Sequence, residues 1–144
     1  MAAFLKEKLP EFDLKIAVNG TLYPLDCEKG ICAKSLDEME QITIENALDF
    51  RKKLISDSTH LEIFNKFQPH RDLKSSLDEL AALKKFFENS VEYEYDRIII
   101  GNEDSIIPSS NQLRAWDCSE KIKVIDGGHF LFYNFESFDE IIRG

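Results

Sequence analysis

Three short apolar runs, each followed by residues that favour a turn, alternate with stretches of helical periodicity along this chain. The runs cover residues 14–18, 97–101 and 122–125, and each ends beside a glycine, an asparagine or an aspartate. The middle run contains three consecutive isoleucines, a pattern typical of a strand buried on both faces of a parallel sheet. The pattern predicts an α/β fold with a short parallel sheet of about three strands and flanking helices.

Helical periodicity dominates the chain between the first and second runs. It extends over residues 35–89, which is far more than a crossover between neighbouring parallel strands requires. We therefore expect residues 35–89 to form an inserted helical subdomain, while residues 1–34 and 90–144 form the core.

Local patterns predict further helices and their starting points. Residues 1–9 and 111–117 are interpreted as helices, and Pro10 ends the first of them. Three Ser-x-x-Glu pairs have the spacing of capping boxes at helix N-termini: Ser35 with Glu38, Ser76 with Glu79, and Ser137 with Glu140.

An acid follows the second run, and a histidine follows the third. Asp104 and His129 each come a few residues after a predicted strand. Because the carboxyl ends of parallel strands meet at one edge of the sheet, we expect these two side chains to lie together there. Taken singly, such an aspartate is more often a turn former and such a histidine an ordinary polar residue. An aspartate followed by a histidine in this order is typical of the last two members of a hydrolase triad.

Three motifs carry a resemblance to a known family. They are NGTLYPLDCEKGI before the helical stretch, and IIIGNEDSIIP and GGHF near the end of the chain. With this order of elements, the chain resembles the C-terminal part of an α/β-hydrolase, and more narrowly the pimeloyl-[acyl-carrier protein] methyl ester esterases of the BioG type, which serve biotin synthesis. The resemblance covers essentially the whole chain but only the later portion of such an enzyme. It implies a serine carboxylesterase in which residues 35–89 are a helical lid, His129 is the general base and Asp104 orients it.

The sequence departs from that family at the nucleophile. Such enzymes carry the catalytic serine on a G-x-S-x-G elbow, and no G-x-S-x-G occurs here. Ser105, Ser109 and Ser110 lie near Asp104 in sequence but are interpreted as turn and cap residues. We therefore expect the chain to be inactive alone, as a C-terminal piece of an esterase or as a stable remnant. The expected partners are the missing N-terminal half or another copy of the chain, because a first strand without its neighbour exposes unpaired backbone groups.

A cluster of basic residues in the helical stretch suggests a second partner. Arg51, Lys52 and Lys53 form the densest cluster of positive charge, and Arg71 follows. Acyl carrier protein is strongly acidic, so the resemblance implies that this strip binds it. The alternative is a solvated helix face with pairs such as Asp49 with Lys53. A non-catalytic module that binds an acidic partner through the helical insertion is the alternative function.

Composition and charge restrict the class of protein further. The net charge of −9 at pH 7 argues against a general nucleic-acid binder, which needs a basic face. We see no apolar segment of the ~20 residues needed to cross a bilayer and no signal-peptide pattern. The cysteines, which are Cys27, Cys32 and Cys118, are odd in number and lack a C-x-x-C pair, so neither a disulfide framework nor a zinc site is expected. A reduced, cytoplasmic compartment fits this composition, and no cofactor or metal is implied.

Overall fold

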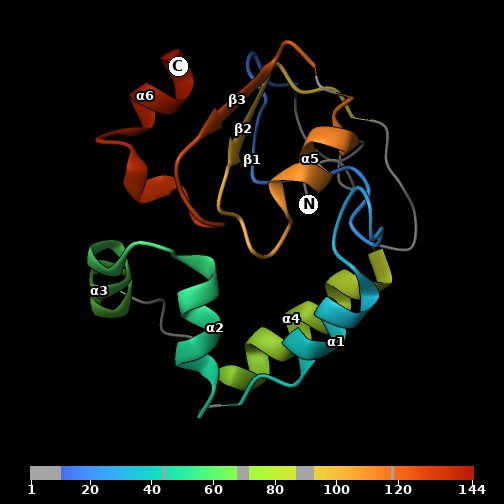
Figure 1. Cartoon of the computed structure of the whole chain (residues 1–144), viewed down its shortest axis with the longest axis vertical. Helices are drawn as coiled ribbons and strands as arrows, with labels where there is room; N and C mark the ends of the chain where they lie inside the picture. The colour runs from blue at the N-terminus through green and yellow to red at the C-terminus, as the bar shows by residue number, and fades with distance from the viewer. Residues whose placement is uncertain (1–10, 44, 68–71, 87–92, 118) are drawn as a thin grey trace.

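The computed structural model describes residues 11–43, 45–67, 72–86, 93–117 and 119–144 (Figure 1). Its three strands, β1 (Ile16–Val18), β2 (Arg97–Gly101) and β3 (Ile122–Ile125), form a parallel sheet in the order β1-β2-β3. The predicted short parallel sheet is therefore confirmed. The predicted helix at residues 1–9 lies outside the described residues.

The central strand β2 is covered on both faces. Ile98 and Ile100 pack with Ala17 on one face, while Ile99 packs with Leu131 on the other. All three isoleucines are buried, as the unbroken apolar run predicts. Strands β1 and β3 each pair with β2 alone among the described strands, so they form the two edges.

Strand β1 is shorter at its start than the apolar run suggests. The backbone N–H of Lys15 donates to the Asp96 carboxylate at 2.7 Å, and the Asp96 N–H donates back to the Lys15 carbonyl at 2.8 Å. The Asp96 side chain thus takes the place of a backbone carbonyl as the acceptor for the Lys15 N–H. The regular pairing of β1 with β2 begins with Ile16 opposite Arg97.

Short helices flank the sheet near the C-terminal part of the chain. Helix α5 (Ser109–Ala115) packs against the face of Ile98 and Ile100, whereas α6 (Phe138–Arg143) supplies Ile141 to the other face. The predicted helix at residues 111–117 therefore begins two residues earlier than its pattern indicated. The 3-10 helix η2 (Phe132–Asn134) precedes α6.

Among the described residues, four helices lie between β1 and β2 in the sequence, within the predicted insertion. They are α1 (Ala33–Glu40), α2 (Ala47–Leu54), α3 (Ser58–Lys66) and α4 (Leu73–Phe86). Figure 1 shows them together on the side of the molecule toward which β2 runs. No helix within the described ranges is long and apolar enough to cross a membrane.

Two backbone carbonyls at the C-terminal end of α2 connect these helices to the core. The Ser105 hydroxyl donates to the Lys53 carbonyl at 2.8 Å, and the Phe130 N–H donates to the Leu54 carbonyl at 2.9 Å. Both donors follow the carboxyl ends of core strands. The end of α2 is therefore held beside the edge of the sheet at which Asp104 and His129 lie.

Two of the three predicted capping boxes are wrong. Ser35 lies inside α1, which begins at Ala33, and Ser76 lies inside α4, which begins at Leu73. At α4, the carboxylate of Asp72 accepts from the Ser75 N–H at 2.6 Å and takes the capping role that the pattern assigned to Ser76.

The third predicted capping box identifies the correct N-cap residue, but its side-chain hydrogen bonds differ from those of a capping box. Ser137 is the N-cap of α6 and makes no side-chain capping bond. The Glu140 carboxylate accepts from the Glu136 N–H at 2.9 Å, one residue before the position that a capping box would use.

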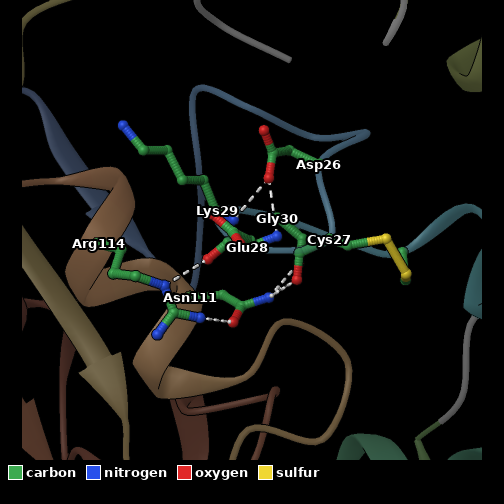
Figure 2. The surroundings of a disulfide bond; sticks show 8 residues. Asp26, Cys27, Glu28, Lys29, Gly30, Asn111 and Arg114 are labelled. Carbon is green, nitrogen blue, oxygen red and sulfur yellow. Dashed lines mark hydrogen bonds between the residues drawn. A yellow bond between two sulfur atoms is a disulfide. The ribbon is translucent and has the colours of Figure 1, made fainter.

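The cysteine prediction is also wrong, because Cys27 and Cys32 form a disulfide (Figure 2). A tight turn brings them together. The Asp26 carboxylate accepts from the backbone N–H groups of Glu28 and Lys29 at 2.8 and 2.9 Å, and these bonds lower the pKa of Asp26. Sequence spacing did not reveal this pair because its proximity comes from the turn.

Glycine is required where this turn folds back on the chain. A Cβ at Gly30 would lie 1.8 Å from the carbonyl oxygen of Tyr23. The Gly30 N–H donates to Asp26 at 2.8 Å, and the next N–H, that of Ile31, donates to Pro24 at 3.0 Å. The resulting loop lies beside α5, where Asn111 donates to its carbonyls (Figure 2).

Candidate functional site

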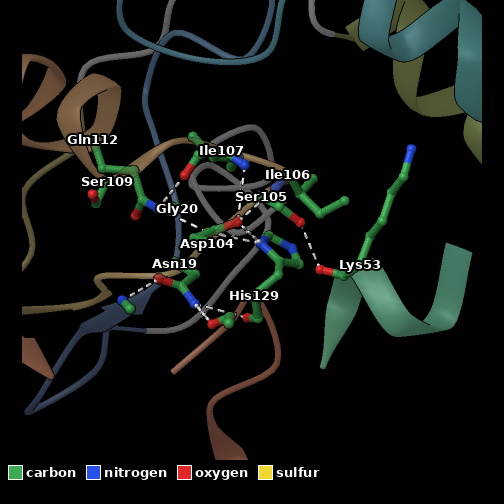
Figure 3. Close-up of polar contacts among 12 residues, drawn as sticks. Asn19, Gly20, Lys53, Asp104, Ser105, Ile106, Ile107, Ser109, Gln112 and His129 are labelled. Carbon is green, nitrogen blue, oxygen red and sulfur yellow. Dashed lines mark hydrogen bonds and ion pairs between the residues drawn. The ribbon is translucent and has the colours of Figure 1, made fainter. Parts of the chain in front are cut away.

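Asp104 and His129, 25 residues apart in sequence, meet at the carboxyl end of the sheet. His129 Nδ1 lies 2.9 Å from Oδ2 and 3.1 Å from Oδ1 of Asp104 (Figure 3). The Asp104 side chain is fully buried, while the His129 side chain is 27% exposed. One group is thus shielded from water, and the other reaches the surface.

The turn after β2 holds the Asp104 carboxylate in place. Its Oδ1 accepts from the backbone N–H groups of Ile106 and Ile107 at 2.8 and 3.0 Å. Its Oδ2 accepts from Nε2 of the buried Gln112 in α5 at 2.9 Å. These partners present only N–H donors, which suits an ionised carboxylate. The fourth donor is then the Nδ1–H of His129, so Nε2 carries the free lone pair in the neutral ring.

The loop that carries His129 approaches the end of β2 closely. A Cβ at Gly101 would lie 2.5 Å from the carbonyl oxygen of Gly127 and 2.6 Å from that of Gly128. Gly127 itself has a φ of 144°, which favours glycine. The absence of a side chain at Gly101 therefore allows the two strand ends to come together, and Gly127 supplies the positive φ of the loop.

Two buried amide side chains complete the site, and sequence analysis did not find either. Gln112 contacts Asp104, and Asn19 at the end of β1 donates to the carbonyls of Gly128 and His129. Asn19 follows the first apolar run as part of the NGT motif, which gives no sign that its side chain is buried. Gln112 lies on a short helix whose pattern gives no sign that this residue is buried.

Comparison with known proteins identifies the family of this chain. The family model described as pimeloyl-ACP methyl esterase BioG matches residues 8–141. The chain belongs to the BioG family. This result supports the narrower resemblance drawn from the NGT and GGHF motifs.

A curated relative and a solved structure extend the comparison. The chain is 28% identical to a malonyl-[acyl-carrier protein] O-methyltransferase of Bacteroides fragilis, over 85% of this chain and 26% of that protein. The crystal structure of BioG from Haemophilus influenzae matches with a TM-score of 0.85 at 22% identity, over 96% of this chain and 66% of that one. The BioG-family chain thus shares the fold of the solved protein and spans about two thirds of its length.

The serines near Asp104 are engaged in local structure. The Ser105 hydroxyl bonds to the Lys53 carbonyl, as Figure 3 shows, and Ser109 is the first residue of α5, with its hydroxyl 3.4 Å from the Asn102 carbonyl. Ser110 is the second residue of that helix and is exposed. Ser105 lies in the turn after β2, in agreement with its interpretation as a turn residue. The cap interpretation is wrong for Ser109 and Ser110, because Pro108 is the N-cap of α5 and both serines lie inside the helix.

The basic residues predicted to bind a partner are only partly described. Lys52 and Lys53 are exposed on α2, and Figure 3 shows the Lys53 side chain directed away from His129. Arg51 belongs to α2 but its side chain is not described, and Arg71 lies outside the described residues. The suggested pair of Asp49 with Lys53 is wrong, because Asp49 pairs with Lys52 at 3.1 Å.

Two cavities lined by described residues include neither Asp104 nor His129 in their linings. A polar cavity of about 490 Å³ lies beside this pair, between the loop of residues 126–130 and the start of α3. A larger apolar groove of about 570 Å³ lies between β1 and α6 and includes neither residue. The apolar groove supplies no group for proton transfer, whereas the Asp104–His129 pair does.

The aromatic residues of helices α2 and α3 and of the C-terminal end of α3 have mixed surroundings. The rings of Phe64 and Phe130 meet edge to face at 5.7 Å, which places α3 against the loop that follows β3. Phe50 lines a small cavity of about 80 Å³ together with Ser105 and Ile106. Phe67 is largely exposed at the C-terminal end of α3.

Proposed function

We propose that this BioG-family chain supplies the acid–histidine half of a serine esterase of the α/β-hydrolase type. Its substrate would be the methyl ester of a pimeloyl chain carried by acyl carrier protein, in biotin synthesis. The observation that supports this proposal is the 2.9 Å contact between His129 Nδ1 and the buried carboxylate of Asp104. That contact leaves Nε2, the opposite ring nitrogen, for proton transfer.

The proposed reaction uses the pair as a base and then as an acid. Nε2 of His129 takes the proton of a serine hydroxyl as the serine oxygen attacks the ester carbonyl carbon. Asp104 stabilises the imidazolium, which returns the proton to the methoxy oxygen, so that methanol leaves and an acyl-serine remains. Water, deprotonated by the same nitrogen, then attacks the acyl-serine. As the bond from the acyl carbon to the serine oxygen breaks, the imidazolium returns its proton to that oxygen, and the acyl chain leaves with a free carboxyl group.

We infer that the serine comes from another polypeptide segment, because the sequence contains no G-x-S-x-G elbow. Two observations support this inference. The solved relative has about a third of its chain beyond the part matched here. Strand β1 also lies at the edge of the described sheet, where a further strand can pair. The N-terminal part of the family fold or another copy of this chain is the proposed partner.

Ester cleavage with an added N-terminal segment tests this function. The segment of the Haemophilus influenzae protein that this chain does not match would be supplied in trans, and hydrolysis of an acyl-carrier-protein methyl ester would be measured. We expect activity only with both parts, and a loss of about 10⁴-fold with His129→Ala. The matched control is His60→Ala, because His60 lies on α3 outside the proposed triad. Restored activity that survives His129→Ala would refute the assignment.

We propose that acyl carrier protein binds the basic strip on α2. Lys52 and Lys53 are exposed there, on a chain that is otherwise strongly acidic, and Arg51 and Arg71 belong to the same proposed strip. If binding occurs without any restorable ester cleavage, the non-catalytic interaction module becomes the better description.

The salt dependence of binding tests the basic strip. We expect binding of acyl carrier protein that weakens as salt increases and that weakens several-fold more with Arg51→Gln and Lys52→Gln together. Lys123→Gln is the control, because Lys123 is exposed on the edge strand β3 and does not belong to α2. An affinity that responds equally to the two sets of substitutions, or that ignores salt, would contradict this docking site.

A further inference from the structure

Asn19 occupies an unusual position at the carboxyl end of β1. It is 6% exposed and has a φ of 44°, in the left-handed region that asparagine tolerates better than most residues. Its backbone N–H donates to the Ile99 carbonyl at 2.9 Å, which fixes its own main chain to β2. The side chain therefore leaves the end of β1 from a defined backbone.

The Asn19 side chain joins the ends of the other two strands. Its Oδ1 accepts from the Gly101 N–H at 2.7 Å, at the last residue of β2. Its Nδ2 donates to the carbonyls of Gly128 and His129 at 2.9 and 2.8 Å, in the loop after β3. Figure 3 shows this amide on the main-chain side of His129, opposite the ring that contacts Asp104.

These three bonds determine the orientation of the amide. Both hydrogens of Nδ2 are used, and Oδ1 faces an N–H donor. Rotating the amide by half a turn would place Oδ1 against two carbonyl oxygens and Nδ2 against the Gly101 N–H. Three bonds of a buried group would be lost together, so the observed orientation is strongly preferred.

We propose that Asn19 is the positioning residue that holds the His129 main chain at the distance from which its ring reaches Asp104. Asp104 is fixed on the β2 side by its own turn and by Gln112. The His129 backbone is held relative to β2 through Asn19, which binds both strand ends at once. The consequence for catalysis rests on the proposed esterase function, whereas the geometric role of Asn19 does not.

Asn19→Asp is the variant that isolates this role. Aspartate also tolerates a positive φ, and one of its oxygens can still accept from the Gly101 N–H. The other oxygen would face two carbonyl oxygens in place of the Nδ2 donor. The substitution thus keeps the backbone and the bond to β2 but turns the attraction for the His129 loop into repulsion.

Asn111 provides a matched control elsewhere in the molecule. It is 7% exposed, and its Nδ2 also donates to two backbone carbonyls, those of Cys27 and Gly30, at 2.9 and 3.0 Å. Asn111→Asp therefore removes the same pair of bonds from an equally buried amide. It does so at the disulfide loop instead of at His129, as Figure 2 shows.

Nitrogen NMR of the histidine rings tests the proposal without substrate or nucleophile. The sequence has three histidines, so His60 and His70 serve as internal references for His129 in ¹⁵N-histidine-labelled protein. In the parent chain, we expect the ring of His129 to be protonated on Nδ1. In Asn19→Asp, we expect the population of His129 rings to shift toward the Nε2–H form. Asn111→Asp should leave the His129 signals unchanged and lower stability less, because the new carboxylate also accepts from the Arg114 guanidinium.

Unchanged His129 ring signals in Asn19→Asp would overturn the proposal, as would equal changes in the two aspartate variants. Should Asn19→Asp not fold, Asn19→Gly permits the same φ and removes all three side-chain bonds, with the same expected shift. Where ester cleavage is restored in trans, Asn19→Asp should lower kcat by about 10²-fold with little effect on KM. An absence of esterase activity leaves the NMR result intact, so the two proposals fail separately.

Discussion

Gln112 directs its side-chain amide at Asp104, with Nε2 2.9 Å from Oδ2 of the carboxylate. The same nitrogen donates to the Ile107 carbonyl at 2.8 Å, in the turn that also binds Asp104. Gln112 is 0% exposed, and its Oε1 has no hydrogen-bond partner within the described part of the chain. A buried acceptor without a partner lowers the stability of the folded state. The two hydrogen bonds of Nε2 must therefore stabilise the fold by more than the unpaired Oε1 destabilises it.

Gln112→Met should lower the free energy of unfolding by about 1–2 kcal/mol. Methionine has a similar length, but it removes two hydrogen bonds, one of them to a charged group, and relieves only one unpaired acceptor. Urea unfolding at neutral pH measures the change. Gln41→Met is the control, because Gln41 is exposed at the end of α1 and the same substitution there should change stability by less than about 0.5 kcal/mol. Equal effects at the two sites would contradict the role assigned to Gln112.

Asp104→Asn should reduce restored ester cleavage by about 10⁴-fold. The amide can no longer hold His129 with its proton on Nδ1, so Nε2 loses its role as a base. The rate is measured with the N-terminal segment supplied in trans. Asp126→Asn is the control at the end of the neighbouring strand, where the carboxylate only accepts from Asn102 at 2.7 Å. A comparable loss in both variants would show that the effect is not specific to the proposed pair.

Reduction of the Cys27–Cys32 disulfide should lower the free energy of unfolding by about 2 kcal/mol. The bond closes a loop with a sequence separation of 5, and a short loop limits the entropy that a cross-link removes from the unfolded chain. Denaturant unfolding with and without a reducing agent gives the difference. Cys118→Ser should retain the full effect, whereas Cys27→Ser should abolish it. Alkylation of all three thiols without prior reduction would contradict the pairing.

The N-terminus of α3 should weaken in acid. The His60 backbone N–H donates to the Asp57 carboxylate at 2.9 Å and lowers the pKa of Asp57, with a smaller contribution from the charge of His60. Because the folded pKa is below the unfolded one, this bond stabilises the helix at pH values above the unfolded pKa. The contribution is lost as the pH falls through the folded pKa.

Amide hydrogen exchange or the chemical shift of the His60 N–H as a function of pH follows this change. Asn at position 57 can cap the helix but does not titrate. Asp57→Asn should therefore flatten the acid dependence at α3 and leave the acid dependence of the Asp26 turn as it was. A parent chain whose α3 N-terminus is insensitive to pH down to acid unfolding would refute this assignment.

The Asp104–His129 pair could be predicted because each member depends on local sequence. Three isoleucines indicate a buried strand, and the glycines before His129 indicate a sharp turn. Parallel strands then bring the residues that follow them to the same edge of a sheet. The pair therefore follows from two local patterns and one rule of topology.

Helix starts were harder to predict, because neighbouring polar residues compete for the same backbone donors. Asp72 and Ser76 are both able to cap α4, and the carboxylate of Asp72 is the group that accepts the free N–H. Which of two nearby caps is used depends on where packing begins the helix, and that information is not local.

The sequence by itself determined the parallel strands, the central buried isoleucines and the order of Asp104 and His129, because strand burial and turn formation are properties of short segments. Only the tertiary structure decided that Cys27 joins Cys32, that Gln112 binds Asp104, and that Asn19 binds both neighbouring strand ends. Asn19 and Gly128 lie 109 residues apart, and their hydrogen bond exists only after the sheet has assembled. An asparagine in a turn motif looks the same whether its amide faces water or the main chain of a histidine.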